Sequence, residues 1–103
     1  MMDMKKMMRD AAAMQEKLQR ELAGMQVSAS AGGGVVTATL NGQKDLLSLQ
    51  LDPAAVDPDD VEMLQDLVVA AVNEASRRVD EQVQAKVGGM IPGGMGALGG
   101  LLG

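Results

Sequence analysis

Three short runs in the middle of the chain alternate apolar and polar side chains, and glycine-containing turns separate them. The runs cover residues 25–30, 35–40 and 45–51. The first turn is Gly32–Gly34, and the second is Asn41-Gly42, a strong hairpin signal because both residues tolerate positive φ in a type I′ turn. Alternation with a period of two is typical of strands with one buried face. The pattern therefore predicts a three-stranded antiparallel meander, with Leu47, Leu49 and Leu51 on its apolar face.

Residues 3–23 precede this predicted sheet and have the spacing of a helix. Apolar side chains recur there at intervals of three and four, which is typical of a narrow seam used in helix pairing. The seam consists of Met4, Met7, Ala11, Met14, Leu18 and Leu22. Gly24 is expected to end the helix. Because Met adapts to irregular partners, we interpret the seam as core or dimer contact rather than as a ligand site.

A second, longer helix is expected to follow the sheet and to extend to residue 87. Asp57 suits its N-cap, Pro58 suits the first helical position, and the next acids suit the positive end of the helix dipole. The wide apolar face of residues 61–75 should lie on the sheet. The later half keeps only a thin stripe of Val79, Val83 and Val87. That half is expected to project from the globule or to pair with another chain.

The predicted fold class is α+β, in the order helix, three-stranded antiparallel β-meander, long helix (αβββα). Residues 1–87 form one domain in this interpretation. From residue 88 to residue 103 the chain is rich in Gly, Met and Leu, without charge or period, which predicts a disordered tail. A domain of this size buries only a modest core, so the apolar surface left over favours a homodimer.

The 103 residues contain no His, no Cys and no aromatic side chain. We therefore expect no catalytic residue, no disulfide, no metal or other cofactor, and no small-molecule substrate. The acids at 57, 59, 60 and 62 are explained by helix capping, and Gly32–Gly34 lacks the ending of a P-loop. Without aromatic rings for base stacking, nucleic acid would be bound through phosphates and shape. No membrane span and no signal peptide are expected, which favours the cytoplasm.

Charge is segregated around the predicted first helix. At about 100° per residue, its cations fall in one arc that lies nearly opposite the apolar seam. These cations are Lys5, Lys6, Arg9, Lys17 and Arg20, and among the acids only Glu16 enters the arc. Such a stripe can track a phosphate backbone. The alternative is a solvated face with pairs such as Glu16 and Arg20, and the formal net charge of −5 weighs against nucleic acid.

In order and spacing, three segments resemble the YbaB/EbfC family of bacterial nucleoid-associated DNA-binding proteins. They are Ala31–Gly42, Leu49–Pro53 and Asp66–Ala75, and the resemblance extends from the Met-rich first helix to about Lys86. It implies a homodimer that binds double-stranded DNA through its helices, in the bacterial cytoplasm and nucleoid. It also implies a link to replication and recombinational repair and a regulatory role. The resemblance favours the phosphate-tracking interpretation, and no base-reading geometry follows, so weak sequence specificity is expected.

The family picture has helices that extend from a dimer core like tweezer arms, so cations of the second helix are expected to assist. These are Arg77, Arg78 and Lys86. The predicted dimer contacts are Met4, Met7, Ala11, Met14, Leu18, Val79 and Val83. Acids dominate residues 45–66 and must face away from a duplex. A rival hypothesis therefore stays open: a non-enzymatic protein-interaction or assembly module, without direct DNA binding.

Overall fold

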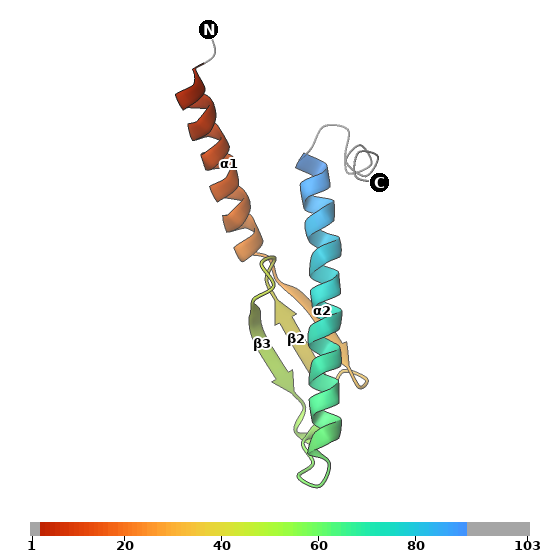
Figure 1. Cartoon of the computed structure of the whole chain (residues 1–103). Coiled ribbons are helices and arrows are strands. Elements are labelled where there is room, and N and C mark those ends of the chain that lie inside the picture. Colours follow the sequence, from red (N-terminus) through yellow and green to blue (C-terminus); the bar gives the residue numbers. More distant parts are fainter. Residues whose placement is uncertain (1–2, 91–103) are drawn as a thin grey trace.

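The computed structural model describes residues 3–90, and their elements follow the predicted order (Figure 1). These elements are α1 (Met4–Ala23), β1 (Val27–Ala31), β2 (Val36–Leu40), β3 (Leu46–Leu51), the short 3₁₀ helix η1 (Pro53–Ala55) and α2 (Val61–Met90). The α+β class and the three-stranded meander are confirmed. The helix α2 continues three residues past the predicted end at residue 87, and the rest of the predicted tail lies outside the described residues.

The three strands form one antiparallel sheet in the order β1-β2-β3. One face carries hydroxyl side chains, which pair across β1 and β2 at 2.6 Å (Ser28 Oγ to Thr39 Oγ1) and 2.8 Å (Ser30 Oγ to Thr37 Oγ1). The other face is apolar and carries alternate residues of each strand. The predicted division into a polar and an apolar face is therefore present.

The core lies between α2 and the apolar face of β1 and β2. Its buried residues are Val27, Ala29, Val36, Ala38, Leu40, Ala71, Ala75 and Val79. Small side chains of α2 allow the helix to approach the sheet closely, since Ala71 and Ala75 are fully covered. Val79 is only 1% exposed and Val83 packs against the same core. The later half of α2 thus stays on the sheet further than its thin apolar stripe suggested.

The β2–β3 connection is a hairpin, as predicted, but the expected type I′ turn at Asn41-Gly42 is wrong. The loop spans Asn41–Asp45, closed by a bond from Asn41 N to Asp45 O of 3.0 Å. Lys44 is its residue of positive φ, at 65°. Such a loop is longer than the expected two-residue turn, and it belongs to the hairpin class in which a turn is followed by a residue in the left-handed conformation, here Lys44. By contrast, Gly32–Gly34 all have positive φ, so the predicted glycine turn between β1 and β2 is confirmed.

The amino-terminal end of α2 also differs from expectation. The helix begins at Val61, and the side chain of Asp60 accepts a bond from Met63 N at 3.2 Å, which is the geometry of an N-cap. Asp57, the predicted cap, instead accepts from Asp59 N at 2.9 Å within the preceding turn. Pro58 lies in that turn rather than at the first helical position.

Candidate nucleic-acid interface

The helix α1 stands clear of the sheet and points away from it (Figure 1). Asp3 caps its amino-terminal end, where the carboxylate accepts from the backbone N–H of Lys5 (3.0 Å) and Lys6 (3.4 Å). No residue of α1 is buried. A rise of 1.5 Å per residue separates its first and last cations by about 22 Å along the helix axis. The helix is therefore an exposed rod with a charged side and an apolar side.

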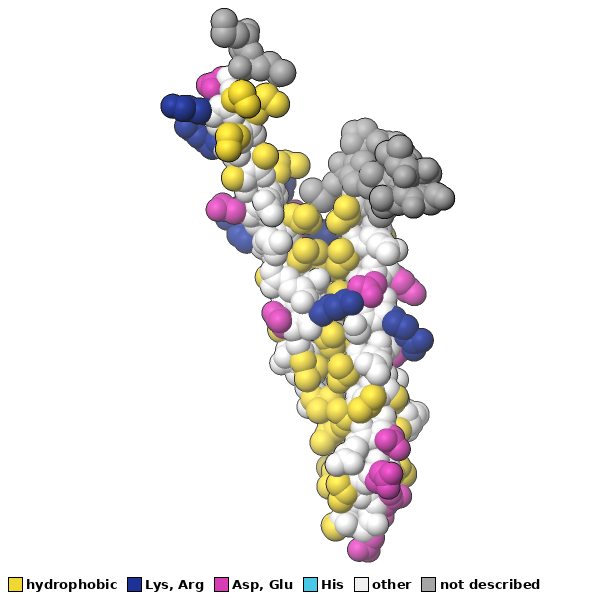
Figure 2. Space-filling view, viewed as in Figure 1, with side chains coloured by type: hydrophobic (Ala, Val, Ile, Leu, Met, Phe, Trp, Pro, Cys, Tyr) yellow, Lys and Arg dark blue, Asp and Glu magenta, His cyan; other side chains and the backbone are white. Residues whose placement is uncertain are grey.

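The cations of the predicted stripe are exposed, and among residues 3–90 none has a carboxylate partner. Lys5, Lys6, Arg9, Lys17 and Arg20 are all exposed. Within residues 3–90, no carboxylate lies within 4.0 Å of any of these five side chains. The pair of Glu16 with Arg20, which would mark a self-neutralised face, is absent from this part of the chain. In Figure 2 basic side chains line the edge of α1 that faces away from α2, and apolar ones lie on the side toward α2.

The cations on α2 have different surroundings. Arg77 and Arg78 both pair with Glu74, and Arg78 also donates from Nη1 to the backbone oxygen of Ser28 at 3.0 Å. Lys86 Nζ lies 3.5 Å from Glu21 Oε2 on α1. Exposed pairs of this kind add little stability, but each places a negative charge beside the cation. Within the described part of the chain, the eight predicted DNA-binding residues thus divide into five without a carboxylate partner and three with one.

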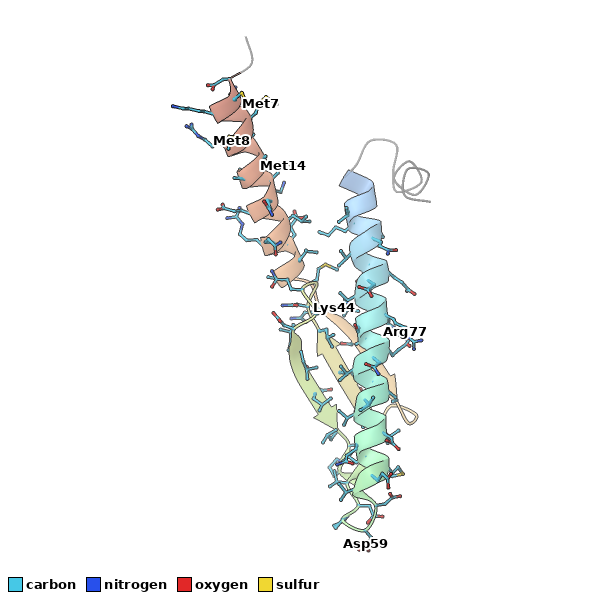
Figure 3. The ribbon with its side chains drawn as sticks, viewed as in Figure 1. Met7, Met8, Met14, Lys44, Asp59 and Arg77 are labelled. Carbon is cyan, nitrogen blue, oxygen red and sulfur yellow. The ribbon has the colours of Figure 1, made fainter. Side chains whose placement is uncertain are left out.

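Acidic side chains gather at the end of the molecule opposite the tip of α1. Asp59 marks this end in Figure 3, where Met7 marks the other. The same end is rich in magenta side chains in Figure 2. It includes the turn and first helical residues at positions 57, 59, 60 and 62. The net negative charge of the chain is therefore concentrated away from the tip of α1.

The predicted apolar seam of α1 is largely uncovered. Met4, Met7 and Met14 are 74%, 52% and 57% exposed, and Leu18 is half-buried. Two other predicted dimer contacts, Val79 and Val83, do not lie on this exposed seam. Val79 is buried in the chain's own core, and Val83 packs against that core. The burial of Val79 removes it from the surface that a second copy could touch.

Sequence reasoning missed a second uncovered apolar surface, on the edge strand β3. Leu49 lies opposite Ala38 and Leu51 opposite Val36, so both leucines share the apolar face of the sheet. Yet α2 crosses β1 and β2 and leaves β3 open. The leucines of β3 are all exposed by 38–50% (Leu46, Leu47, Leu49 and Leu51). The alternating pattern predicted a common face for Leu47, Leu49 and Leu51, but only the position of α2 shows that this part of the apolar face is uncovered.

Residues 3–90 contain no cluster of acids that could hold a metal ion. In the same range, neither helix has an apolar stretch long enough to span a membrane. Three surfaces stand out among the described residues: the charged basic stripe of α1, and the two apolar ones, the seam of α1 and the β3 leucines.

A model of the YbaB/EbfC DNA-binding family matches residues 1–95. The chain belongs to the YbaB/EbfC family. A nucleoid-associated protein of Koribacter versatilis is 53% identical to it over 94 residues, which are 91% of this chain and 92% of that protein. Another, from Acetivibrio thermocellus, is 52% identical over 96 residues, covering 93% of this chain and 80% of the relative.

The fold has also been seen in a solved structure of a more distant chain. The crystal structure of an uncharacterized protein from Helicobacter pylori aligns with a TM-score of 0.71. The alignment covers 87% of this chain and 98% of the other, at 22% sequence identity. At that identity the likeness establishes the shared fold alone. The YbaB/EbfC family is described by DNA binding and not by an enzymatic reaction.

Proposed function

We propose that this protein is a nucleoid-associated homodimer that binds double-stranded DNA with weak sequence specificity. The observation that carries the proposal is the stripe of five exposed cations on α1 without a carboxylate neighbour in residues 3–90. Membership of a DNA-binding family and close relatives named nucleoid-associated proteins support it. The bacterial nucleoid is the corresponding location.

The proposed mechanism is electrostatic. Each cation that neutralises a phosphate releases condensed counterions, which favours binding and makes affinity fall as salt rises. A stripe about 22 Å long follows several successive phosphates along a duplex, given the helical rise of α1 and the spacing of phosphates. The acidic end of the molecule lies far from the tip of α1 and so leaves this contact unopposed (Figure 2).

Weak specificity follows from the kinds of side chain in the basic arc of α1. Besides the five cations, the arc contains only Ala13, Glu16 and Ala23. Adenine is usually read by Asn or Gln, and the two glutamines of α1, Gln15 and Gln19, lie outside this arc. Arg and Lys can contact guanine as well as phosphate, but the arc has no Asn or Gln that would read adenine beside them, which supports phosphate contact as its main mode of binding.

The homodimer is supported by the apolar surface that the single chain leaves uncovered. An amphipathic helix of twenty residues without one buried residue needs a partner for its apolar side. The β3 leucines form a second such surface. Larger exposed apolar patches mark interaction sites, and a second copy would cover these surfaces while leaving the basic stripe of each α1 free.

The test is DNA retardation in a gel with the variant in which Lys6, Arg9, Lys17 and Arg20 are all replaced by Gln. The expected result is loss of retardation with unchanged helicity by circular dichroism, because all four side chains are exposed. Unchanged retardation would refute the assignment of the interface. If the wild-type chain also fails to retard DNA, and instead retains a protein on pull-down, the rival assembly-module hypothesis replaces the proposal.

A further inference from the structure

Within a single chain, α1 has no fully buried face that could set its orientation, because none of its residues is buried. Covalently, α1 is joined to the sheet only through the short segment 24–26. Within the chain, the direction in which the basic stripe points therefore depends on the few contacts near the carboxyl end of α1.

Most of these contacts come from one place, the hairpin loop Asn41–Asp45. Gly42 N donates to Leu22 O at 2.7 Å, and Gln43 Nε2 donates to Gln19 Oε1 at 2.9 Å. The approach at Gly42 is so close that a Cβ there would lie 2.8 Å from Leu22 O and 2.9 Å from Leu22 Cα. The loop thus closes directly on the last turn of α1, with no room for a side chain at position 42.

The same loop is internally fixed. Asn41 is 5% exposed, and its Oδ1 accepts from Gln43 N at 2.9 Å and from Asp45 N at 3.0 Å. Two backbone donors are therefore held by one buried amide, which restrains the path of the loop between β2 and β3. A loop held in this way keeps a fixed position relative to the sheet, and it can therefore fix the position of the last turn of α1, which it contacts.

The loop also contacts α2. Lys44 Nζ donates to Asp80 Oδ2 at 3.0 Å and lies 2.8 Å from Asp80 Oδ1. A direct bridge between the helices, Glu21 to Lys86 at 3.5 Å, lies nearby. Figure 3 shows Lys44 between the lower end of α1 and the middle of α2. The loop is thus the joint at which α1, the sheet and α2 meet.

We propose that the loop Asn41–Asp45 is a positioning element, which fixes the angle at which α1 leaves the sheet. Its consequence for DNA rests on the proposed function: in a homodimer, that angle sets the separation of the two basic stripes. Phosphates occur at fixed intervals along a duplex, so two stripes bind one duplex well only at a matching separation. The assigned residues are Gly42 and Gln43, which act through α1 without contacting DNA themselves.

The main test is Gly42→Ala, whose methyl group would meet the backbone of Leu22 and displace the last turn of α1. Gln43→Ala is a milder second variant, which removes the amide contact without a clash. The matched control is Gly33→Ala in the other hairpin. No atom lies within 4 Å of a Cβ there, although its φ of 74° makes the substitution costly for the backbone. The control therefore lowers stability without touching α1.

Position is measured by pulsed electron paramagnetic resonance on the full chain. The sequence has no Cys, so spin labels attach only at the exposed sites of Ala12→Cys on α1 and Gln82→Cys on α2. Excess unlabelled chain removes distances between subunits. We expect the α1–α2 distance distribution to shift or broaden in Gly42→Ala, to broaden less in Gln43→Ala, and to stay as in wild type in Gly33→Ala. Wild-type distributions in both loop variants would overturn the proposal. If Gly42→Ala does not fold, the distance distribution of Gln43→Ala alone tests the proposal, and a wild-type distribution there would overturn it.

Affinity for random-sequence duplex is measured in parallel on unlabelled chains. Gly42→Ala should weaken binding by about tenfold at 0.1 M salt for each phosphate that the displaced stripe no longer reaches, whereas Gly33→Ala should bind as wild type. A shifted distance with unchanged affinity would overturn the link between loop and DNA. If wild-type protein does not bind DNA, the proposed function fails, while the distance measurement still decides whether the loop positions α1.

Discussion

Two pairs of arginines, one on α1 and one on α2, allow the role of α1 to be tested with two variants that lose the same charge and the same type of residue. Arg9 and Arg20 belong to the stripe that lacks carboxylate neighbours in residues 3–90, whereas Arg77 and Arg78 both pair with Glu74. The variants Arg9→Gln/Arg20→Gln and Arg77→Gln/Arg78→Gln remove the same two positive charges from each chain. Any difference between them therefore reports where the DNA lies and not how negative the protein is.

The expected magnitude follows from counterion release. In a homodimer the α1 variant removes up to four phosphate contacts, and each contact contributes about 0.9 to the slope of log affinity against log salt. The slope should therefore become shallower by up to about 3.6, and affinity at 0.1 M salt should fall by up to roughly 4 × 10³-fold. The α2 variant should change the slope by less than about 1, because its cations already face a carboxylate.

The assay is fluorescence anisotropy with a labelled random duplex, from 50 to 200 mM salt as an approximate range in which such losses are large. Circular dichroism of both variants controls for helicity. Equal changes of slope in the two variants would refute the preference for α1. A larger change in the α2 variant would move the interface to the second helix.

Three further predictions concern stability and association. Replacing Val79 by Ala should lower the free energy of unfolding by about 2 kcal/mol, because two core methyl groups are removed. The measurement is a urea titration at fixed protein concentration. As a control, Val69→Ala, at a side chain 57% exposed, should change the free energy of unfolding by less than about 0.5 kcal/mol. Asp60→Ala should cost about 1 kcal/mol in the same titration, and an equal or larger cost for Asp57→Ala would restore the predicted cap. Leu49→Gln should shift the sedimenting species toward the monomer, since about 1–2 kcal/mol of apolar burial is removed from each subunit, and an unchanged mass would exclude β3 from the dimer contact.

Local patterns in the sequence predicted the elements and their order. They failed to predict the geometry of a turn or cap where that geometry depends on contacts between distant elements. The hairpin at Asn41-Gly42 was predictable, but Gly42 serves the close approach of Leu22 and not a positive φ. Turn chemistry alone cannot show this, because Leu22 lies twenty residues earlier in the chain. The positive φ falls instead on Lys44, where no glycine signals it.

Capping and charge pairing show the same limit. The run Asp57–Asp60 offers several candidate caps, and in the structure Asp60 is the one whose side chain accepts from the first turn of α2. The pairing of Arg78 with Glu74 follows from a spacing of four residues on one helix. The bridge between Glu21 and Lys86 joins two helices and could not be predicted from either one. The basic stripe was predictable because the period of a single helix determines which of its residues share a face.

The central claim is that DNA contacts the basic stripe of α1, and protection of lysines from an amine-reactive reagent tests it most directly. Modification of each lysine is measured by mass spectrometry, with and without random duplex DNA at low salt. The account predicts that DNA protects Lys5, Lys6 and Lys17 and leaves Lys44, whose side chain is 46% exposed and paired with Asp80, as reactive as before. Protection of Lys44 with unchanged reactivity at the three lysines of α1 would contradict it.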